Sequence, residues 1–283
     1  MLIPPKESEF DAYLDFAYGL SQDPARSGYP TYRDGIKTRE TFISHARRAF
    51  SRPDWEALLF TLDGQVEGLI VFDHTDKERY IHTDMFNIRR DTQTALAEFV
   101  NYCRERWPGF DLDLGFPAEN TQALSWLEGA GVPCLERSWN YQIFLDSYTP
   151  LPEDPSVRRV TADSFEEFAA VHSRIEGDMY WNCKRVRETL NDWAIFVTGE
   201  PFSPTAGEVL MTDRGDEHQE IFALEFADEY AFRNLLTAAL NHLKARKMKY
   251  LTFFVDDGSE EGKILTELGF QLVGGYVAHR IRL

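Results

Sequence analysis

The sequence predicts an α/β (α+β) protein made of two similar halves in tandem. Helix-like and strand-like apolar patterns follow one another in the same order in both halves. A connector at 146–155, with three prolines and three acidic residues, separates them. Equivalent positions also recur at a constant offset: Trp55 and Trp193 each open a strand, and Gly131 and Gly269 each end a short helix.

The connector sets the predicted domain boundaries. We expect an N-terminal domain at 1–148, a linker at 149–155 and a C-terminal domain at 156–283. Each domain is long enough to bury a core of its own. The alternative is that two unrelated α/β domains happen to share similar turn residues.

Composition and charge narrow the range of partners. The 283 residues contain 47 acidic and 30 basic side chains, a formal net charge of −17. This charge argues against a broad nucleic-acid surface or an anionic membrane surface. It would attract a cationic small substrate, or it simply keeps the chain soluble. The three cysteines form no C-x-x-C pair, and the N-terminus lacks the pattern of a signal peptide, so we expect a cytoplasmic protein.

Capping and turn residues delimit the elements of the first half. Ser8 and Thr38 can each cap a helix, because a hydroxyl oxygen accepts from a free N–H of the first turn. Asp63-Gly64 between two apolar runs predicts a hairpin, because its turn needs positive φ. The expected elements are helices beginning at 8 and 38, strands at 55–62, 66–72 and 80–88, a helix at 92–107, a strand at 110–116, a short helix at 120–131 and a strand at 134–145.

The second half repeats this order. Its first helix turns Phe165, Phe168 and His172 inward. The expected elements are a strand at 157–160, helices at 163–174 and 183–190, strands at 193–198, 207–212 and 219–226, a helix at 230–246, a strand at 249–255, a helix at 259–268 and a last strand ending at 283.

This order of elements resembles the GNAT N-acyltransferase family, once per half and over nearly the whole chain. Ile264-Leu-Thr-Glu-Leu-Gly-Phe270 is similar to that family's short helix ending in Leu-Gly-Phe. Asn120-Thr-Gln-Ala123, in the first half, is similar to the Asn-x-x-Ala start of the same helix. The resemblance implies two tandem GNAT-like domains, each a mixed, mostly antiparallel sheet flanked by helices.

The resemblance also implies an acyl-CoA cofactor, acetyl-CoA or another acyl-CoA. In the family the fourth and fifth strands of the domain splay apart and hold the pantetheine between them. The first turn of the long helix binds the pyrophosphate through backbone N–H groups and the helix dipole. By position, the implied cofactor-binding residues of the second half are Phe226, Ala227, Arg233, Asn234, Leu235 and Leu236.

The phosphate loop departs from the family pattern in both halves. The two glycines of that loop are replaced by Asn234 and Leu236 in the second half, and by Asp91 and Gln93 in the first. Glycines would let the backbone approach the phosphates, and the charge of Asp91 would repel them.

Three arginines near these loops leave two readings open. Arg89, Arg90 and Arg233 would pair with phosphates, or they are solvated charges at the starts of helices. The tyrosine that many family members carry on the short helix, as a proton donor to the thiolate, is replaced by Leu127 and Leu265.

Amine acylation needs a base and an oxyanion donor. The family places the donor on a backbone N–H of the fourth strand, here near Phe226 or Ala227, and the base on a carboxylate of or beside that strand. In the second half the candidates are Glu225, whose change to Gln should lower turnover, and Glu220. His82 and Asp84 are their first-half counterparts. The alternative is that all are polar residues of half-exposed strands.

The loop between the first two helices lines the acceptor site in this family. Here that loop mixes aromatic rings with carboxylates in both halves, which suits a cationic amine. The alternative is that the rings pack between helices or between the halves. The implied acceptor-binding residues are Tyr29 and Tyr32 in the first half and Asp178, Tyr180 and Trp181 in the second.

These features favour acyl-CoA-dependent N-acylation, most simply N-acetylation, of a small amine. We place the chemistry in the second half, with the first half as scaffold or acceptor wall. The alternative is a degenerate GNAT-like protein that binds a ligand or partner without catalysis; a third reading is transfer of an aminoacyl or larger acyl group. We expect no metal site, no nucleic acid and no membrane partner, and the sequence leaves a homo-oligomer open.

Overall fold

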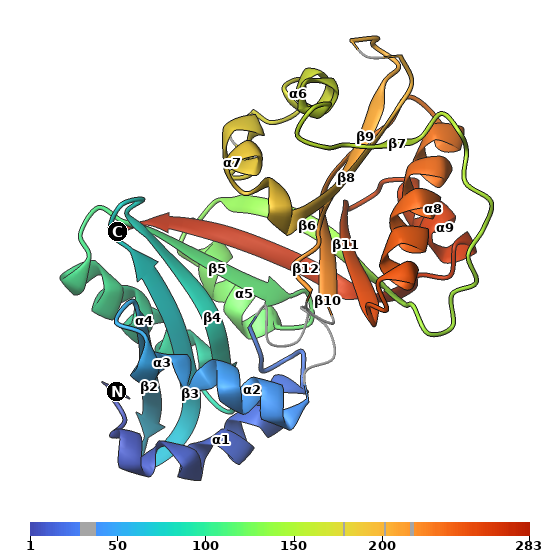
Figure 1. Ribbon diagram of the computed structural model, residues 1–283. Helices are drawn as coiled ribbons and strands as arrows, with labels where there is room; N and C mark the ends of the chain where they lie inside the picture. Colours follow the sequence, from blue (N-terminus) through green and yellow to red (C-terminus); the bar gives the residue numbers. More distant parts are fainter. Residues whose placement is uncertain (29–37, 178, 201, 216–217) are drawn as a thin grey trace. The chain divides into compact units, whose positions relative to one another are not determined.

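The computed structural model describes all residues of the chain except 29–37, 178, 201 and 216–217. Contacts divide the chain into two compact units (Figure 1). Unit 1 comprises residues 1–140 and 273–283, and unit 2 comprises residues 141–272.

Unit 1 is a sheet with the strand order β1-β2-β3-β4-β5-β12. All its neighbouring strands are antiparallel except β4 and β5, which are parallel. The elements are β1 (Leu2–Ile3), α1 (Glu7–Ser21), α2 (Arg39–Ala46), α3 (Arg48–Ser51), β2 (Trp55–Leu62), β3 (Gln65–Thr75), β4 (Tyr80–Ile88), α4 (Thr92–Arg106), β5 (Asp111–Pro117), α5 (Thr121–Gly129) and β12 (Gln271–Arg282).

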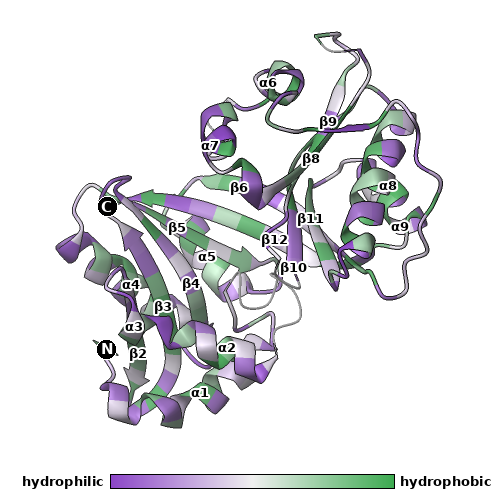
Figure 2. Cartoon of the chain, viewed as in Figure 1, coloured by the Kyte–Doolittle hydropathy of each residue, from purple (hydrophilic) through white to green (hydrophobic). Residues whose placement is uncertain are grey.

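Helices cover both faces of this sheet, and each face has its own apolar cluster. Alternating strand residues supply the two clusters, because successive side chains point to opposite faces. Leu59 and Val71 pack with α1 and α2, whereas Phe60, Phe72 and Phe86 pack with α4 and α5. In Figure 2 the helices carry both hydrophobic and hydrophilic residues, as helices with one face on a sheet do.

Two local predictions for unit 1 are confirmed. Asp63 and Gly64 both have positive φ, 51° and 76°, in the turn between β2 and β3. Thr38 accepts a hydrogen bond from the N–H of Thr41 at 3.2 Å and caps α2. Ser8, in contrast, lies within α1 and does not cap it, since that helix begins at Glu7.

Unit 2 is a sheet with the strand order β6-β11-β10-β9-β8-β7, in which β10 and β11 are parallel. Its elements are β6 (Cys134–Phe144, in unit 2 from Tyr141), β7 (Arg158–Arg159), α6 (Phe165–His172), α7 (Cys183–Glu188), the 3₁₀ helix η1 (Leu190–Asp192), β8 (Trp193–Thr198), β9 (Gly207–Thr212), β10 (His218–Glu225), α8 (Glu229–Ala245), β11 (Tyr250–Asp256) and α9 (Glu261–Glu267).

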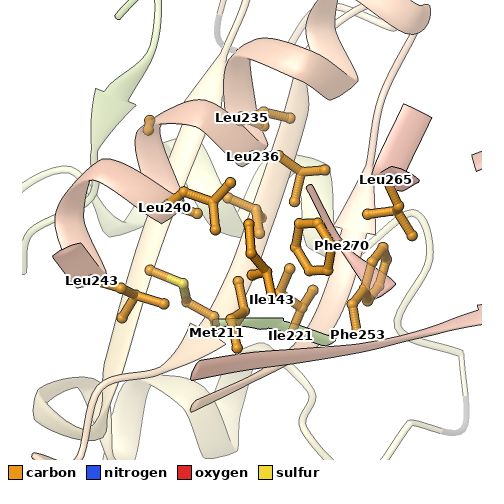
Figure 3. Packing of buried hydrophobic residues seen from close by; sticks show 14 of the residues in the cluster. Ile143, Met211, Ile221, Leu235, Leu236, Leu240, Leu243, Phe253, Leu265 and Phe270 are labelled. Carbon is orange, nitrogen blue, oxygen red and sulfur yellow. The ribbon is translucent and has the colours of Figure 1, made fainter. Parts of the chain in front are cut away.

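The two faces of this sheet are also covered separately. Figure 3 shows the larger cluster, in which Leu236 and Leu240 of α8 meet Met211 and Ile221 of the sheet. The opposite face packs α6 and α7 against Trp193 and other residues of β8. The predicted α/β (α+β) class, with mixed and mostly antiparallel sheets flanked by helices, is confirmed.

The last strand of the chain does not belong to the unit that precedes it. β12 pairs antiparallel with β5 of unit 1, from Tyr276 opposite Pro117 to Arg282 opposite Asp111. Its Val277 side chain is fully buried in the unit 1 core. Conversely, the end of β6, predicted to close the first half, lies in unit 2. The compact units therefore differ from the predicted domains at 1–148 and 156–283, because the two halves exchange their closing strands.

Candidate functional site

In both units the two parallel strands separate partway along. The ladder between β10 and β11 ends at Ile221 and Phe253, although both strands continue. The ladder between β4 and β5 likewise ends at His82 and Asp113. Beyond these points the described residues show no parallel strand paired with that edge of β10 or with that edge of β4.

A bulge marks the same place in each unit. In β10 the register with β9 shifts between Ile221 and Ala223, which leaves Phe222 as the extra residue. In β4 the register with β3 shifts in the same way around Asp84. Such bulges re-aim side chains and interrupt pairing, and they are common next to active sites.

In unit 1 the chain itself fills the free edge of β4. The N–H of Ile88 donates to the carbonyl of Arg26 at 2.9 Å. Gly28 lies so close that a Cβ added there would stand 2.9 Å from the Cβ of Phe86. From the other side, the Asn120 amide donates to the carbonyl of Ser27 at 3.0 Å. The segment 26–28 thus occupies the free edge of β4.

The matching edge in unit 2 is not filled in this way. Leu224 stands opposite Val209 in the same register in which Phe86 stands opposite Ile70. By this register the N–H groups of Leu224 and Phe226 point away from β9. Within the described part of the chain, no segment outside the sheet bonds to either N–H group. Among the described residues, these two edge N–H groups of unit 2 are therefore not bonded to another backbone segment.

The start of α8 is acidic, which fits a diphosphate poorly. Asp228 caps the helix by accepting from the N–H of Ala231 at 2.8 Å. The carboxylate of Asp154, from the linker, accepts from the Tyr230 hydroxyl and from the Asn234 amide. These side chains place negative charge where the helix dipole would otherwise attract phosphates.

The structure corrects the predicted phosphate loop of the second half. Because α8 begins at Glu229, Asn234 and Leu236 lie in its second turn and not in a loop before it. Leu235 and Leu236 are fully buried in the core, so their side chains are not available to a cofactor. Phe226 lies just before the helix and packs on Phe232 of α8, with ring centroids 4.8 Å apart. The neighbouring Ala227 is exposed.

Arg233 is engaged by protein carboxylates. Its guanidinium bonds to Glu229 one turn earlier at 2.7 Å and also pairs with Glu267 of α9. Both pairs raise the pKa of Arg233 and so favour its charged form. The arginine joins α8 to α9, which favours the structural reading over phosphate binding.

We expect Arg233→Ala to leave the affinity for acetyl-CoA unchanged within about threefold, since exposed ion pairs stabilise weakly and locally. Calorimetric titration of the variant and the parent protein measures this. A larger loss of affinity would return Arg233 to the cofactor site.

Arg89 and Arg90 of unit 1 are engaged as well. Their guanidinium groups lie 2.6 and 2.5 Å from the two oxygens of Glu67, whose side chain is 1% exposed. The hydrogen bonds from Arg89 and then Arg90 lower the pKa of Glu67 from 4.5 to about 2. The three side chains form a local ion cluster at the end of β4.

We expect Glu67→Gln to lower the free energy of unfolding of unit 1 by about 2 kcal/mol at pH 7. The folded-state pKa of Glu67 is depressed, so its contribution is present above about pH 4.5 and is lost as pH falls through about 2. Urea unfolding at neutral and acid pH measures the difference. A difference that did not shrink in acid would contradict this account of the cluster.

Aromatic rings gather beside the bulge of β10. The ring of Trp181 lies 4.8 Å from those of Tyr180 and Trp193, and Phe222 lies 5.6 Å from Trp193. The guanidinium of Arg214 stands 5.6 Å from the Trp193 ring. We call Tyr180, Trp181, Trp193 and Phe222 the aromatic wall. Two of the predicted acceptor residues, Tyr180 and Trp181, belong to it.

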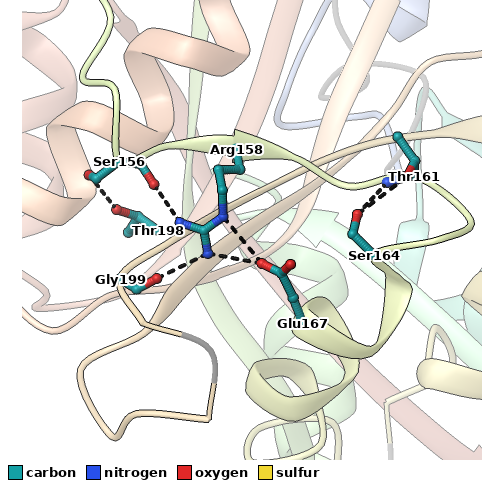
Figure 4. Close-up of polar contacts among 7 residues, drawn as sticks. All are labelled: Ser156, Arg158, Thr161, Ser164, Glu167, Thr198 and Gly199. Atoms are coloured by element: carbon teal, nitrogen blue, oxygen red, sulfur yellow. Dashed lines mark hydrogen bonds and ion pairs between the residues drawn. The ribbon is translucent and has the colours of Figure 1, made fainter.

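A buried pair lies behind this wall. Nδ1 of His172, on α6, is 2.5 Å from Oε1 of Glu208 on β9, and both side chains are at most 1% exposed. Nε2 of His172 is 2.7 Å from the carbonyl oxygen of Trp181. Figure 4 shows how α6 is held: Arg158 donates to Glu167 at 2.9 Å and to the carbonyl of Gly199 at 3.0 Å.

The predicted base candidates flank the bulge on the wall side of β10. Glu225 is the cross-strand partner of Glu208, and directly opposite residues share a face. Glu220 alternates with the core residue Ile221 and therefore faces the wall side. Its N–H donates to the hydroxyl of Thr212, the cross-strand partner of Trp193, at 2.9 Å. Glu220 is thus the carboxylate nearer the aromatic wall.

The first-half candidates sit in a different setting. Asp84 is the buried bulge residue of β4, and Nε2 of His45 lies 2.9 Å from its carboxylate. His82 lies 3.3 Å from Asp73 on the neighbouring strand. The other predicted acceptor residues, Tyr29, Tyr32 and Asp178, lie outside the described residues.

Sequence reasoning identified His172 as inward-facing but missed its partner. Glu208 is the one charged residue in the strand Gly207–Thr212, which was a usable signal. Asp154 could not be found, because its contact with α8 spans 76 residues to Tyr230. No helix of the described chain is long and apolar enough to cross a bilayer. The described residues also contain no group of three His, Cys, Asp or Glu side chains placed to bind a metal.

Known structures share this fold over nearly the whole chain. A GCN5-related N-acetyltransferase from Sphaerobacter thermophilus aligns at 16% identity with a TM-score of 0.64, covering 99% of this chain and 95% of its own. A tandem GNAT protein from the clavulanic acid biosynthesis pathway aligns at 12% identity and 0.57, covering 99% and 98%. A Drosophila protein aligns at 12% identity and 0.59, also covering 99% and 98%.

These likenesses establish the class of fold, which is that of the tandem GNAT N-acetyltransferases. The resemblance predicted from the sequence is confirmed at that level. No protein-family model matches the chain, and no curated protein matches it significantly.

Proposed function

We propose that this chain is an acyl-CoA-dependent N-acyltransferase, with acetyl-CoA as its simplest donor, that acylates a small amine in unit 2. The observation that carries the proposal is the difference between the two strand edges. The edge of β4 is filled by the segment 26–28, whereas within the described residues no segment outside the sheet bonds to the N–H groups of Leu224 on β10 and of Phe226 just after it.

The residues of unit 2 fit the pantetheine arm better than the diphosphate. The arm would run along β10, bonded to the edge N–H groups. The diphosphate would meet Asp228 and the carboxylate of Asp154 near the start of α8. We therefore expect acetyl-CoA to bind chiefly through its pantetheine.

The roles of the residues follow from their places around the bulge. Acyl-CoA supplies a thioester whose carbonyl carbon bonds to the amine nitrogen as the thiol leaves. The N–H of Leu224, the edge donor nearer the bulge, would donate to the carbonyl oxygen as negative charge develops there. This replaces the expectation of Phe226 or Ala227 as donor. Glu220, beside the wall, would take the proton of the amine, with Glu225 as the second candidate.

Leu265 of α9 has no proton to give to the departing thiolate. In this proposal the proton comes from water or from the ammonium by way of Glu220.

A second candidate function is ligand or partner binding without catalysis. The acidic start of α8 favours it, since Asp228, Glu229 and Asp154 oppose a diphosphate at the usual place. This candidate predicts that the chain binds neither acetyl-CoA nor CoA.

Calorimetric titration with acetyl-CoA and with free CoA tests the proposal. We expect saturable binding with one site per chain. Retention of the site in Arg89→Ala, a unit 1 variant, would agree with cofactor binding in unit 2. An absence of binding at millimolar acetyl-CoA would overturn the acyl-CoA proposal and leave the non-catalytic function in front.

A further inference from the structure

His172 makes two hydrogen-bonded contacts inside unit 2, and both run to acceptors. The carbonyl of Trp181 can only accept, so Nε2 of His172 must carry a hydrogen. Nδ1 faces a carboxylate oxygen of Glu208 at 2.5 Å, so one further proton lies between these two atoms. The imidazole is also stacked on Phe168, with centroids 4.7 Å apart, which holds the plane of the ring.

Among the described residues, the Glu208 side chain makes no hydrogen bond other than the one to His172. Its Oε2 atom is buried and has no hydrogen-bond partner within the described residues. A buried carboxylate is costly unless it is paired, so its contact with Nδ1 must satisfy it. That contact in turn orients the ring and leaves Nε2–H directed at Trp181.

The loop that carries Tyr180 and Trp181 is attached in several ways, and the Trp181 ring packs on Trp193 of β8. The Glu176 carboxylate accepts from the N–H of Cys183 at 2.7 Å, and Asn182 caps α7 through the N–H of Arg185. Both of these contacts are local to the α6–α7 connection. The bond from His172 to Trp181, in contrast, links this loop through Glu208 to β9.

We propose that His172 is a positioning residue for the acceptor site: held by Glu208, it clamps the carbonyl of Trp181 and so sets the place of Tyr180 and Trp181 in the aromatic wall beside the bulge of β10. The inference rests on the proposed function in naming the wall as the acceptor side. The clamp itself is a property of the fold and can be tested without acyl transfer.

The electrostatic surroundings of His172 and Glu208 favour retention of the proton that lies between them. Burial alone would lower the pKa of His172, but the hydrogen bond and charge of Glu208 outweigh burial and raise it. Burial also raises the pKa of Glu208, with a further contribution from Glu225 on β10. Arg174, which follows α6, acts to lower the pKa of Glu208. Glu176 acts to raise the pKa of His172. Cys183 on α7 is a further titratable neighbour, and burial raises the pKa of its thiol to about 12.

Two matched variants separate the clamp from simple destabilisation. In His172→Gln the longer amide reaches the Nε2 position and can still donate to Trp181, whereas in His172→Asn the amide reaches only the Nδ1 position. Hydrogen exchange of the amides of 183–186 in the full chain is the readout. We expect exchange to be at least about tenfold faster in His172→Asn and within about threefold of the parent in His172→Gln. His242→Asn, which breaks the contact between His242 of α8 and Asp213 just after β9, is the control and should leave these amides unchanged.

Equal acceleration of these amides in both His172 variants would overturn the clamp. If His172→Asn does not fold, nitrogen NMR of the His172 imidazole in the parent protein is the deciding measurement. A protonated Nε2 throughout the folded pH range is expected, and an unprotonated Nε2 would overturn the proposal. A chain that passes these tests but transfers no acyl group would refute the proposed function and leave the clamp intact.

Discussion

Glu220→Gln should lower the turnover of acetyl-CoA-dependent amine acylation by a factor of about 100 or more, the usual range for loss of a general base. The amide keeps the size of the side chain but cannot accept the proton of the ammonium. Because Glu220 lies on the wall side of β10, away from the free edge, the affinity for acetyl-CoA should stay the same. Steady-state kinetics and calorimetry on the same preparation measure both quantities.

Glu225→Gln is the matched comparison. Glu225 sits on the same strand and the same face, but it is paired across to Glu208 and lies past the bulge. We expect a reduction of no more than about tenfold for this variant. The reverse order, with Glu225→Gln the more damaging change, would make Glu225 the base, and unchanged turnover in both would remove β10 carboxylates from the mechanism.

Removal of residues 275–283 should unfold unit 1, although it shortens the chain at the end of the second half. The deletion takes away the ladder with β5 and the buried side chains of Val277 and Ile281. It also removes Arg280, whose guanidinium bonds to both oxygens of Asp113 at 2.6 and 2.8 Å. The loss is about 5 kcal/mol or more, comparable with the whole stability of a small domain.

Hydrogen exchange resolved by peptide checks this result. Peptides from β2, β3 and β4 of unit 1 should lose protection, while those from β8 and β9 of unit 2 keep it. Addition of a synthetic peptide spanning 273–283 should restore part of the protection. Loss of protection in unit 2 with unit 1 intact would show that β12 stabilises unit 2 and would contradict this prediction.

Local sequence patterns predicted the fold well where local forces decide it. The Asp63-Gly64 turn, the Thr38 cap and strand 80–88 follow from φ preferences, side-chain acceptors and alternation, and all three are found. The exchange of closing strands was not predictable. Both strands follow a short helix ending in glycine and carry the same alternating pattern, so either would fit either sheet edge.

The site was predicted less completely, because it depends on contacts between distant segments. The carboxylates Glu220 and Glu225 were named from strand alternation alone. The filling of the β4 edge by segment 26–28 depends on a bond across 62 residues, from Ile88 to Arg26, and nothing in either local sequence signals it. The start of α8 was predicted to within one residue, but the phosphate loop of the second half was misassigned, because Asn234 and Leu236 lie inside the helix.

Hydrogen exchange of the intact chain with and without saturating acetyl-CoA tests the central claim most directly, because it locates the ligand as well as detecting it. The account predicts slower exchange in 222–232, at the free edge of β10 and the start of α8, and no change in 84–92 of unit 1. Protection of 84–92, or no change in either segment, would contradict the claim that unit 2 holds the acyl donor.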